Sequence, residues 1–348
     1  MEKINKILDR TVNLLQAVGI TPVMAVVFLG LSVVPLFIRD EFLLRLLTSS
    51  LMFGGLAMAF DFTAGYINIV NFGFAAFMGV GAYASGLAVL NLGISPLLGL
   101  LFGAFVAGLI GYGLGLLTMR LGGIFAACMA WFVALALMAI AANWVGLTRG
   151  NSGLSVPPLF NTTNNLPYYY VVLIMIVFIY VLLTRISKSK IGLAFRAIGQ
   201  DTQAAASSGV YATKYKVINF TISCCLAGFL GGFYAHFIGI LTPQVLHTRN
   251  TVEVMAISYI GGRGTIWGGL ICAIILVPLM QYLKGLMELR LIMYGALMIF
   301  VMIFYPRGLV GLWERGSDFL KRKVGVAKAI RREGKDVPKE AKNKGRLQ

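Results

Sequence analysis

Few residues of this chain have types and spacings that could do chemistry. The two histidines, His236 and His247, have no carboxylate or cysteine neighbour at metal-ligand spacing. Every cysteine lies inside an apolar run, where this residue behaves as a small hydrophobe. We therefore expect no metal site and no redox pair, and we expect His236 to form a hydrogen bond between helices or to lie near the outer surface. The cysteines are Cys128, Cys224, Cys225 and Cys272.

Enzyme motifs are also absent from the sequence. There is no GxxxxGK[ST] phosphate-binding loop, no HExxH and no GxSxG. The chain is therefore not expected to hydrolyse ATP through such a loop. An intramembrane enzyme is a third-ranked hypothesis, because no acid, base, nucleophile or metal cluster is paired. No catalytic residue, cofactor or metal ligand is assigned.

One short stretch differs from its surroundings and could bind a partner. Residues 190–210, KIGLAFRAIGQDTQAAASSGV, are small, polar and basic in a hydrophobic chain. Asp201 can cap a short helix over 202–208, Gly209 can end that helix in a left-handed conformation, and Gly199 separates it from a preceding turn. Its bare alanine and serine face permits close approach by a partner's groove. An interfacial helix that holds the protein together fits this pattern equally well.

The elements that position this stretch are membrane helices. Of 348 residues, 58% are hydrophobic and 12% are charged, and the mean hydropathy is +0.83; soluble domains have roughly 25% charged residues. Apolar stretches of about 20 residues recur, as a bilayer core of about 30 Å requires of a helix. They lie at about 21–38, 42–60, 66–90, 96–117, 123–145, 167–184, 216–240, 252–283 and 291–305. They are continuous rather than alternating, which argues against a β-barrel. The sequence predicts an all-α integral membrane protein, a polytopic helical bundle.

Charge predicts how this bundle is oriented. The loop 185–216 has six Lys and Arg against Asp201 alone, so we expect it in the cytoplasm. The loops 146–166 and 241–251 each have a single Arg and are expected outside. The apolar segment 252–283 is long and contains Gly261-Gly262-Arg263-Gly264. Splitting it there, into two crossings or a re-entrant pair, gives about ten crossings with both termini in the cytoplasm.

The two ends of the chain have their own character. Residues 1–20 place apolar side chains at helical spacing, which predicts an amphipathic helix on the membrane surface. Residues 21–313 form the predicted membrane domain. Residues 314–348 hold 12 Lys and Arg against 5 Asp and Glu and are expected to form a basic cytoplasmic tail beside anionic lipid. This placement of the net charge of +17 argues against nucleic acid as a partner.

Two apolar segments are interrupted by glycine and polar residues. Residues 61–81 contain Asn68 and Asn71 among glycines, and 252–283 breaks at the glycines above. Irregular backbone at membrane depth is tolerated only where protein or a water-filled path satisfies it. Gly-interrupted segments in two halves point to a translocation path between repeats. The six-residue spacings of Gly73 to Gly79 and Gly262 to Gly268 are consistent with such repeats.

Acidic residues are scarce within the spans. Asp61 and Glu253 lie near the ends of apolar segments, and the central stretches are almost free of acids. Ion-coupled carriers usually place such residues inside the membrane. A chain that lines a path without them would take its energy from an ATPase partner on the cytoplasmic side.

Four segments resemble the permeases of ABC importers for branched-chain amino acids, specifically the M-type subunit of LIV systems. They occur in family order over roughly residues 40–312. They are GYINIVNFGFAAFMGVGAYASG, the run from IGLAFRAIGQDTQAAASSGV to GFYAHFIGILTP, EVMAISYIGGRGTIWGGLICA and MYGALMIFVMIFYPRGLVG. The resemblance implies a bacterial inner-membrane subunit with four kinds of partner: an H-type permease, two cytosolic ABC ATPase subunits, an extracytoplasmic solute-binding protein and membrane lipid.

The resemblance also implies roles for particular residues. An ATPase-coupling loop would include Gly192, Arg196, Asp201, Ala204, Ala205 and Gly209. A translocation path would include Asn68, Asn71, Gly73, Gly79, Tyr83, Gly261, Gly262, Gly264 and Trp267. The family often has more acid in the loop, in the style of E-D-x-x-A-A, where this chain has QDTQ at 200–203. A particular salt bridge to the ATPase is therefore not expected, although docking is.

These observations predict a permease that imports branched-chain amino acids with energy from separate ATPase chains. The alternative is a stand-alone carrier or channel for a small polar solute. The exact substrate is not encoded in these residues, because related permeases carry urea, short amides or other amino acids, and specificity rests largely with the binding protein.

Overall fold

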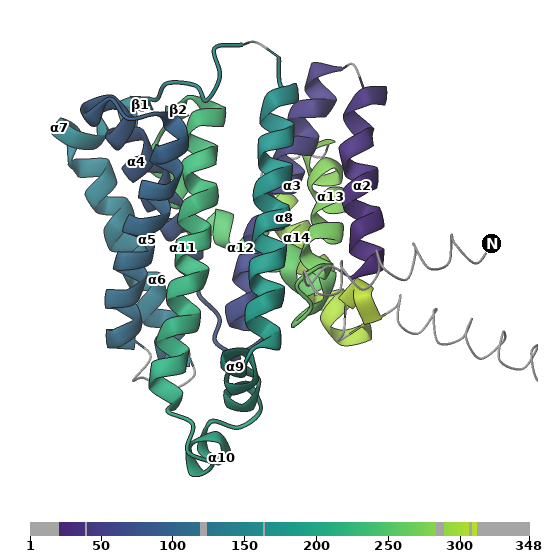
Figure 1. Cartoon of the computed structure of the whole chain (residues 1–348). Helices are drawn as coiled ribbons and strands as arrows, with labels where there is room; N and C mark the ends of the chain where they lie inside the picture. Colours follow the sequence, from purple (N-terminus) through teal and green to yellow (C-terminus); the bar gives the residue numbers. More distant parts are fainter. Residues whose placement is uncertain are drawn as a thin grey trace, which may run out of the picture.

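The computed structural model describes residues 21–38, 40–118, 124–162, 164–282, 289–305 and 308–311. These residues are almost entirely helical (Figure 1). The longer helices are α2 (Pro22–Phe37), α3 (Glu41–Ala64), α4 (Phe74–Leu92), α5 (Pro96–Thr118), α6 (Ile124–Asn143), α8 (Leu166–Lys188), α9 (Lys190–Gln200), α11 (Ala212–Ile238), α12 (Thr248–Gly262), α13 (Gly268–Tyr282) and α14 (Leu289–Phe304). The expected N-terminal helix at 1–20 and the tail at 314–348 lie outside the described residues.

Short elements complete this part of the chain. They are α7 (Val145–Thr148), α10 (Thr202–Ser207), the 3-10 helices η1 (Gly150–Ser152) and η2 (Pro243–Leu246), and the strands β1 (Leu154–Ser155) and β2 (Ile240–Leu241). The two strands pair antiparallel, with Leu154 opposite Leu241. Beside this hairpin-like pair, Nδ1 of the buried His236 donates to the carbonyl of Pro157 at 2.8 Å, and Nε2 lies 2.9 Å from the hydroxyl of Ser85. The expected interhelical role of His236 is confirmed.

Six of these helices are long and apolar enough to cross a bilayer: α3, α4, α5, α6, α8 and α11. They contain 19 to 27 residues, and a helix rises about 1.5 Å per residue. Shorter apolar helices include Val23–Phe37 and Gly268–Tyr282. The all-α membrane architecture is thus present, whereas a count of about ten crossings stays a prediction.

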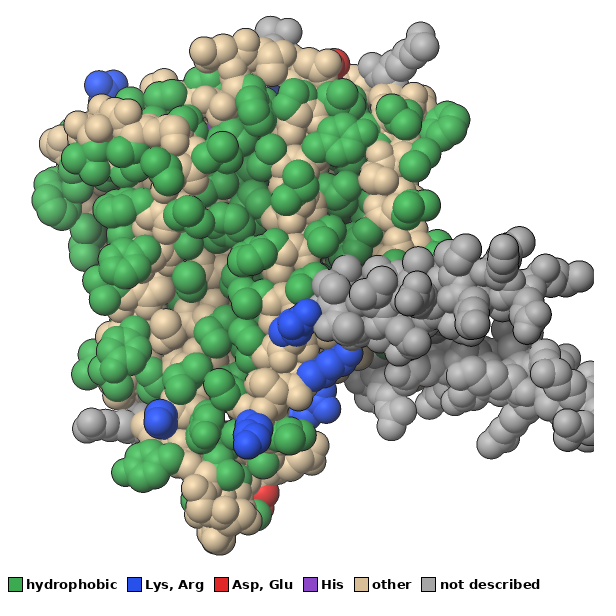
Figure 2. All heavy atoms as spheres, viewed as in Figure 1, with side chains coloured by type: hydrophobic (Ala, Val, Ile, Leu, Met, Phe, Trp, Pro, Cys, Tyr) green, Lys and Arg blue, Asp and Glu red, His purple; other side chains and the backbone are tan. Residues whose placement is uncertain are grey.

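The surface of the bundle is apolar around its middle and basic at one end. Large hydrophobic side chains on α5 and α6, such as Phe105 and Phe132, are exposed. Figure 2 shows hydrophobic side chains over the height of the bundle and Lys and Arg gathered toward the end that carries α9 and α10. An exposed apolar surface of this extent requires lipid or a membrane partner against it.

Small residues allow α4, α5 and α11 to approach closely. Gly99, Gly103, Ala107, Gly111 and Gly115, a ladder on α5, are all buried. A Cβ on Gly103 would meet the carbonyl oxygen of Gly81 on α4, and one on Gly111 would meet Cys224 on α11 at 2.6 Å. Small residues at four-residue spacing therefore pack helices together here, as the sequence predicts.

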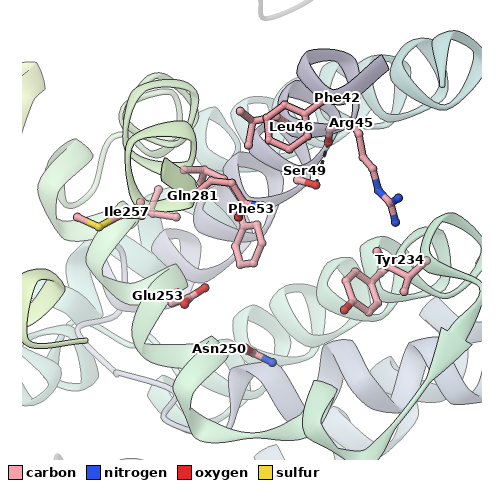
Figure 3. Close-up of a pocket in the computed structure, with 13 residues that line it drawn as sticks. Phe42, Arg45, Leu46, Ser49, Phe53, Tyr234, Asn250, Glu253, Ile257 and Gln281 are labelled. Carbon is pink, nitrogen blue, oxygen red and sulfur yellow. Dashed lines mark hydrogen bonds between the residues drawn. The ribbon is translucent and has the colours of Figure 1, made fainter. Parts of the chain in front are cut away.

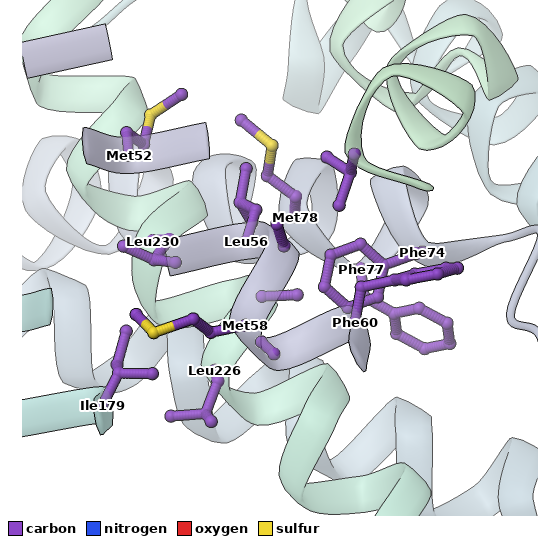
Figure 4. Packing of buried hydrophobic residues seen from close by; sticks show 14 of the residues in the cluster. Met52, Leu56, Met58, Phe60, Phe74, Phe77, Met78, Ile179, Leu226 and Leu230 are labelled. Atoms are coloured by element: carbon purple, nitrogen blue, oxygen red, sulfur yellow. The ribbon is translucent and has the colours of Figure 1, made fainter. Parts of the chain in front are cut away.

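Helix α3 runs through the centre of the protein. It packs against α8, α11, α12 and α13, and its side chains from Leu51 to Ala64 are almost all buried. Figure 4 shows Leu56, Met58 and Phe60 of α3 among side chains of neighbouring helices. Helix α3 therefore contacts four other helices of the bundle along its length.

The two interrupted segments differ in structure. The interruption predicted within 61–81 is present, since α3 ends at Ala64, residues 65–73 are irregular and α4 begins at Phe74. The apolar segment over 66–90 is therefore helical only from Phe74 onward. The break in 252–283 is confirmed, since α12 ends at Gly262 and α13 begins at Gly268. Gly73 and Gly79 belong to the start of one helix, whereas Gly262 and Gly268 lie on different helices. Their equal spacing therefore marks no equivalent structure.

Candidate functional site

The helices α9 and α10 project beyond the end of the bundle (Figure 1). The chain turns sharply from α8 into α9 at Ser189, whose hydroxyl accepts from the backbone N–H of Gly192 at 3.4 Å. A Cβ on Gly192 would collide with the carbonyl oxygens of Ile186 and Ser187. Gly192 thus permits this corner. The segment expected to be a turn is a complete helix of 11 residues.

Both ends of α10 are capped as the sequence predicts. The carboxylate of Asp201 accepts from the backbone N–H groups of Gln203 at 2.7 Å and Ala204 at 3.0 Å. These donors lower the pKa of Asp201 from its ordinary value. At the other end Gly209 has φ of 83°, and Val210 N–H donates to the carbonyl of Ala205 at 3.0 Å. This is a Schellman cap, which glycine favours.

The α9–α10 pair presents two different faces. Ala204, Ser207 and Ser208 are exposed, whereas Ala205 is only 5% exposed. Ala205 therefore lies on the face of α10 that packs on the protein, and the free face is formed by its neighbours. Arg196 on α9 is exposed, and its guanidinium carbon lies 5.5 Å from the ring centroid of Tyr66.

Hydrogen bonds join α9 to the end of α3 and to the turn between α12 and α13. Asn68 donates from Nδ2 to the carbonyl of Gly199, and its Oδ1 accepts from Arg263. Arg263 also donates from Nε and Nη2 to the carbonyl of Ala64, at 3.1 and 3.0 Å. Asn68 holds this position with a left-handed backbone, φ 56°.

Asp61 completes the same junction from the last turns of α3. Its Oδ1 accepts from the backbone N–H of Gly264 at 2.9 Å and lies 3.5 Å from the hydroxyl of Ser258. The carboxyl group is buried, and its Oδ2 has no hydrogen-bond partner within the described ranges. We call Asp61, Asn68, Gly199, Arg263 and Gly264 the junction cluster. It connects the projecting pair to helices that run into the bundle.

The nine residues expected on a translocation path lie in separate places. Asn68 and Gly264 belong to the junction cluster, and Gly261 and Gly262 end α12 beside it. Asn71 is buried and its Oδ1 accepts from the backbone N–H of Gly73 at 3.0 Å. The remaining four are Gly73, Gly79 and Tyr83, which start or lie on the buried face of α4, and Trp267, which packs partly buried against the core.

A cavity of about 570 Å³ opens between α3, α11, α12 and α13 in the other half of the bundle (Figure 3). None of the nine expected path residues lines it. Its lining residues are Phe42, Arg45, Leu46, Ser49, Phe53, Tyr234, Ile238, Asn250, Glu253, Ile257, Val277, Met280 and Gln281. A smaller pocket of about 40 Å³ shares Phe53, Tyr234 and Asn250 with it and reaches Phe74 and Ala75 at the start of α4.

Local contacts hold the polar side chains of this cavity. The guanidinium of Arg45 lies 5.7 Å from the ring centroid of Phe237. Asn250 donates to the carbonyls of Gln244 and Val245, at 3.2 and 3.0 Å. Glu253 is only 8% exposed. Figure 3 shows Arg45, Tyr234, Asn250 and Glu253 around one space, from three helices.

The residues that line this cavity have no role predicted from the sequence. The sequence feature that could have indicated the cavity is one charge of each sign, Arg45 and Glu253, within segments that are otherwise apolar. Both lie near segment ends, which made them unremarkable in sequence. Their convergence depends on packing between α3 and α12, which hydropathy does not encode.

Comparison with known proteins assigns the chain to a family. The family model described as "Branched-chain amino acid transport system / permease component" matches residues 42–302. LivM of Salmonella typhimurium, a high-affinity branched-chain amino acid transport system permease protein, is 26% identical over 309 residues, with 81% of this chain and 72% of LivM covered. LivH of the same organism is 22% identical, with 74% and 90% covered.

A relative with another named role is the autoinducer 2 import system permease protein LsrC of Yersinia enterocolitica, 28% identical over 214 residues, with 58% of this chain and 57% of LsrC covered. No solved structure matches the chain. Since the family model covers well over half of the sequence, including the α9–α10 pair and the cavity, this chain belongs to the permease-component family of branched-chain amino acid transport systems.

Proposed function

We propose that this chain is the membrane-spanning permease subunit of an ABC importer for branched-chain amino acids. It would pair with an H-type permease, two cytosolic ATPase subunits and an extracytoplasmic solute-binding protein. The relatives named LivM and LivH support the substrate class and the second permease. The geometric observation that carries the proposal is the capped α9–α10 pair, which projects from the basic end of the bundle with a bare alanine and serine face.

The junction cluster gives this pair a route into the bundle. ATPase subunits that close on α9 and α10 would displace Gly199, and with it Asn68 and Arg263. Arg263 lies between α12 and α13 and is bonded to the end of α3. Because α3 and α12 also line the cavity, a displacement at one end would change the cavity in the other half. Such coupling needs a packed element with two arrangements.

The orientation follows from the charges of the loops. The basic end with α9 and α10 is proposed to face the cytoplasm, and the end with β1 and β2 to face the solute-binding protein. The chain would thus receive the amino acid through the half that contains the cavity and release it beside the ATPases.

Reconstitution tests the proposed function. Liposomes that contain ATP are prepared with the full chain, its second permease and the two ATPase subunits, and the binding protein is added. The entry of radiolabelled leucine is then followed. We expect transport that requires both ATP and the binding protein. Transport by this chain alone, without ATP, would instead establish a stand-alone carrier.

A further inference from the structure

The cavity combines charges of both signs in one space. Among the described residues that line it, Arg45 is the cation and Glu253 the anion, so the lining has no net charge. Its volume of about 570 Å³ falls in the range of about 300–1,000 Å³ typical of small-molecule sites. A charge that is buried inside a membrane protein, as that of Glu253 is, is costly and usually has a function.

The two charges are suited to different groups of one ligand. Arg45 presents a planar guanidinium, which forms paired hydrogen bonds with a carboxylate, and Phe237 packs beneath it. Glu253 is almost fully buried, and attraction between opposite charges is stronger where water is excluded. A carboxylate in that setting is suited to an ammonium group.

The rest of the lining separates into a polar and an apolar part. Ser49, Tyr234, Asn250 and Gln281 supply uncharged hydrogen-bonding groups. The apolar part is formed by Leu46, Phe53, Ile257, Val277 and Met280. Figure 3 shows the ring of Phe53 between Arg45 and Glu253, so an apolar wall adjoins both charges.

We propose that this cavity is a binding site within the permease for the zwitterion of an aliphatic α-amino acid. Arg45 binds the α-carboxylate, Glu253 binds the α-ammonium group, and the wall around Phe53 holds the side chain. The inference rests on the proposed function for the substrate class and adds a site inside the permease that selects it. An anion would be opposed by Glu253 and a cation by Arg45, and an uncharged amide would match neither charge.

Competition binding to the full chain tests the site. The chain is placed in lipid nanodiscs without partners, and bound radiolabelled leucine is displaced by leucine, leucinamide or 4-methylpentanoate. Leucinamide lacks the carboxylate and 4-methylpentanoate lacks the ammonium group. We expect leucine to displace the label at least tenfold better than either analogue. Equal displacement by the three compounds, or no saturable binding, overturns the proposal.

Two variants assign each charge to its group. Arg45→Gln should weaken leucine binding at least tenfold and remove the preference over leucinamide, and Glu253→Gln should remove the preference over 4-methylpentanoate. Glu41→Gln and Arg149→Gln are matched controls, because both residues lie outside the cavity lining. They should bind leucine as the unaltered chain does. Loss of binding in a control to the same extent contradicts the assignment.

The unaltered chain keeps the proposal testable even if a variant does not fold, since analogue competition requires no substitution. Transport in the reconstituted importer separates this inference from the proposed function. ATP-driven leucine transport without any leucine binding to the permease overturns the cavity site and leaves the proposed function standing. Selective binding without ATP-driven transport supports the site and contradicts the proposed function.

Discussion

Asp201 acts on α10 through the backbone. Its carboxylate accepts from two backbone N–H groups at the start of the helix, and these donors satisfy the cap without a basic partner. The QDTQ sequence at 200–203 has no second acid beside Asp201. A structural cap is therefore sufficient to explain why an acid stands at this position.

We expect asparagine at position 201 to preserve the function of Asp201 and alanine at this position to impair it. Asn caps helices about as well as Asp, whereas Ala offers no acceptor. We expect Asp201→Asn to retain leucine uptake and Asp201→Ala to reduce it severalfold at equal protein levels. Uptake by membrane vesicles that contain the complete importer measures both. Equal uptake by the two variants would contradict the capping role.

The pH dependence of this cap follows from the direction of the pKa shift. The pKa of Asp201 is lower in the folded protein than its ordinary value near 3.9. Its contribution is therefore complete above the ordinary value and is lost only as pH falls through the lower, folded value. We expect uptake profiles of the unaltered chain and Asp201→Asn to superpose between pH 5 and 8; a difference there would require another role for the carboxylate.

Asn68 combines a strained backbone with a connecting side chain. Its φ of 56° is tolerated by Asn and Gly far better than by other residues. Asn68→Gly should therefore keep the fold and remove the bonds to Gly199 and Arg263. We expect ATP hydrolysis to continue with at least a tenfold loss of leucine moved per ATP. Asn68→Ala adds backbone strain of about 1–2 kcal/mol and should also lower the thermal midpoint.

At the scale of elements, α10 separates a structural face from a free face. A test of docking has to alter the free face, and Ala205 is on the other one. The two faces could not be distinguished from the sequence, because three consecutive alanines give no pattern that indicates which side of the helix is buried. The caps were predictable from Asp201 and Gly209, since each acts on its own backbone neighbours.

Tryptophan at two adjacent positions should distinguish these faces. Ala204→Trp should leave the protein inserted and thermally stable but prevent copurification of the ATPase subunits and abolish uptake. Ala205→Trp should overpack the buried side and cost about 1–3 kcal/mol, seen as a lower melting temperature in detergent. Unchanged copurification with Ala204→Trp would return α9 and α10 to a purely structural role.

The interrupted segments show where hydropathy succeeds and where it fails. Four residues, Gly261 to Gly264, contain three glycines and correctly indicated the break between α12 and α13. Asn68 and Asn71 among glycines likewise indicated the interruption that the structure has at 65–73, although Ile67, Ile69 and Val70 belong to the apolar segment 66–90. Ile67 and Ile69 are indeed buried, yet their backbone is irregular. Burial and helicity are separate properties, and composition reports only the first.

At the scale of the molecule, the two ends of the bundle should lie on opposite sides of the membrane. We expect a thiol reagent that cannot cross membranes to label Ser155→Cys from outside intact cells and Ser207→Cys only after permeabilisation. Both positions are exposed. The background should carry Cys128→Ala and Cys225→Ala, because these two native cysteines are partly exposed. Labelling of both positions in intact cells would contradict the proposed orientation.

The architecture of the bundle was largely predictable, whereas its cavity was not. Each long span has its own apolar sequence, so the spans expected at 96–117 and 123–145 agree closely with α5 and α6. Arg45 and Glu253 come together only through contacts between α3 and α12, which are far apart in the sequence. A single sequence contains no record of such contacts, and a charge near the end of a span is ordinary by itself.

The composition of α12 has a consequence for how the protein is made. This helix of 15 residues contains Arg249, Asn250 and Glu253 and is not among the helices apolar enough to span a bilayer. Its own partition free energy would not carry it into the membrane during synthesis. We therefore expect it to enter through packing on α3 and α4, which the ribosome makes earlier, and on α13, which follows, since α12 contacts all three. Assembly of the cavity is thus expected to end with a late step, after the long helices have been inserted.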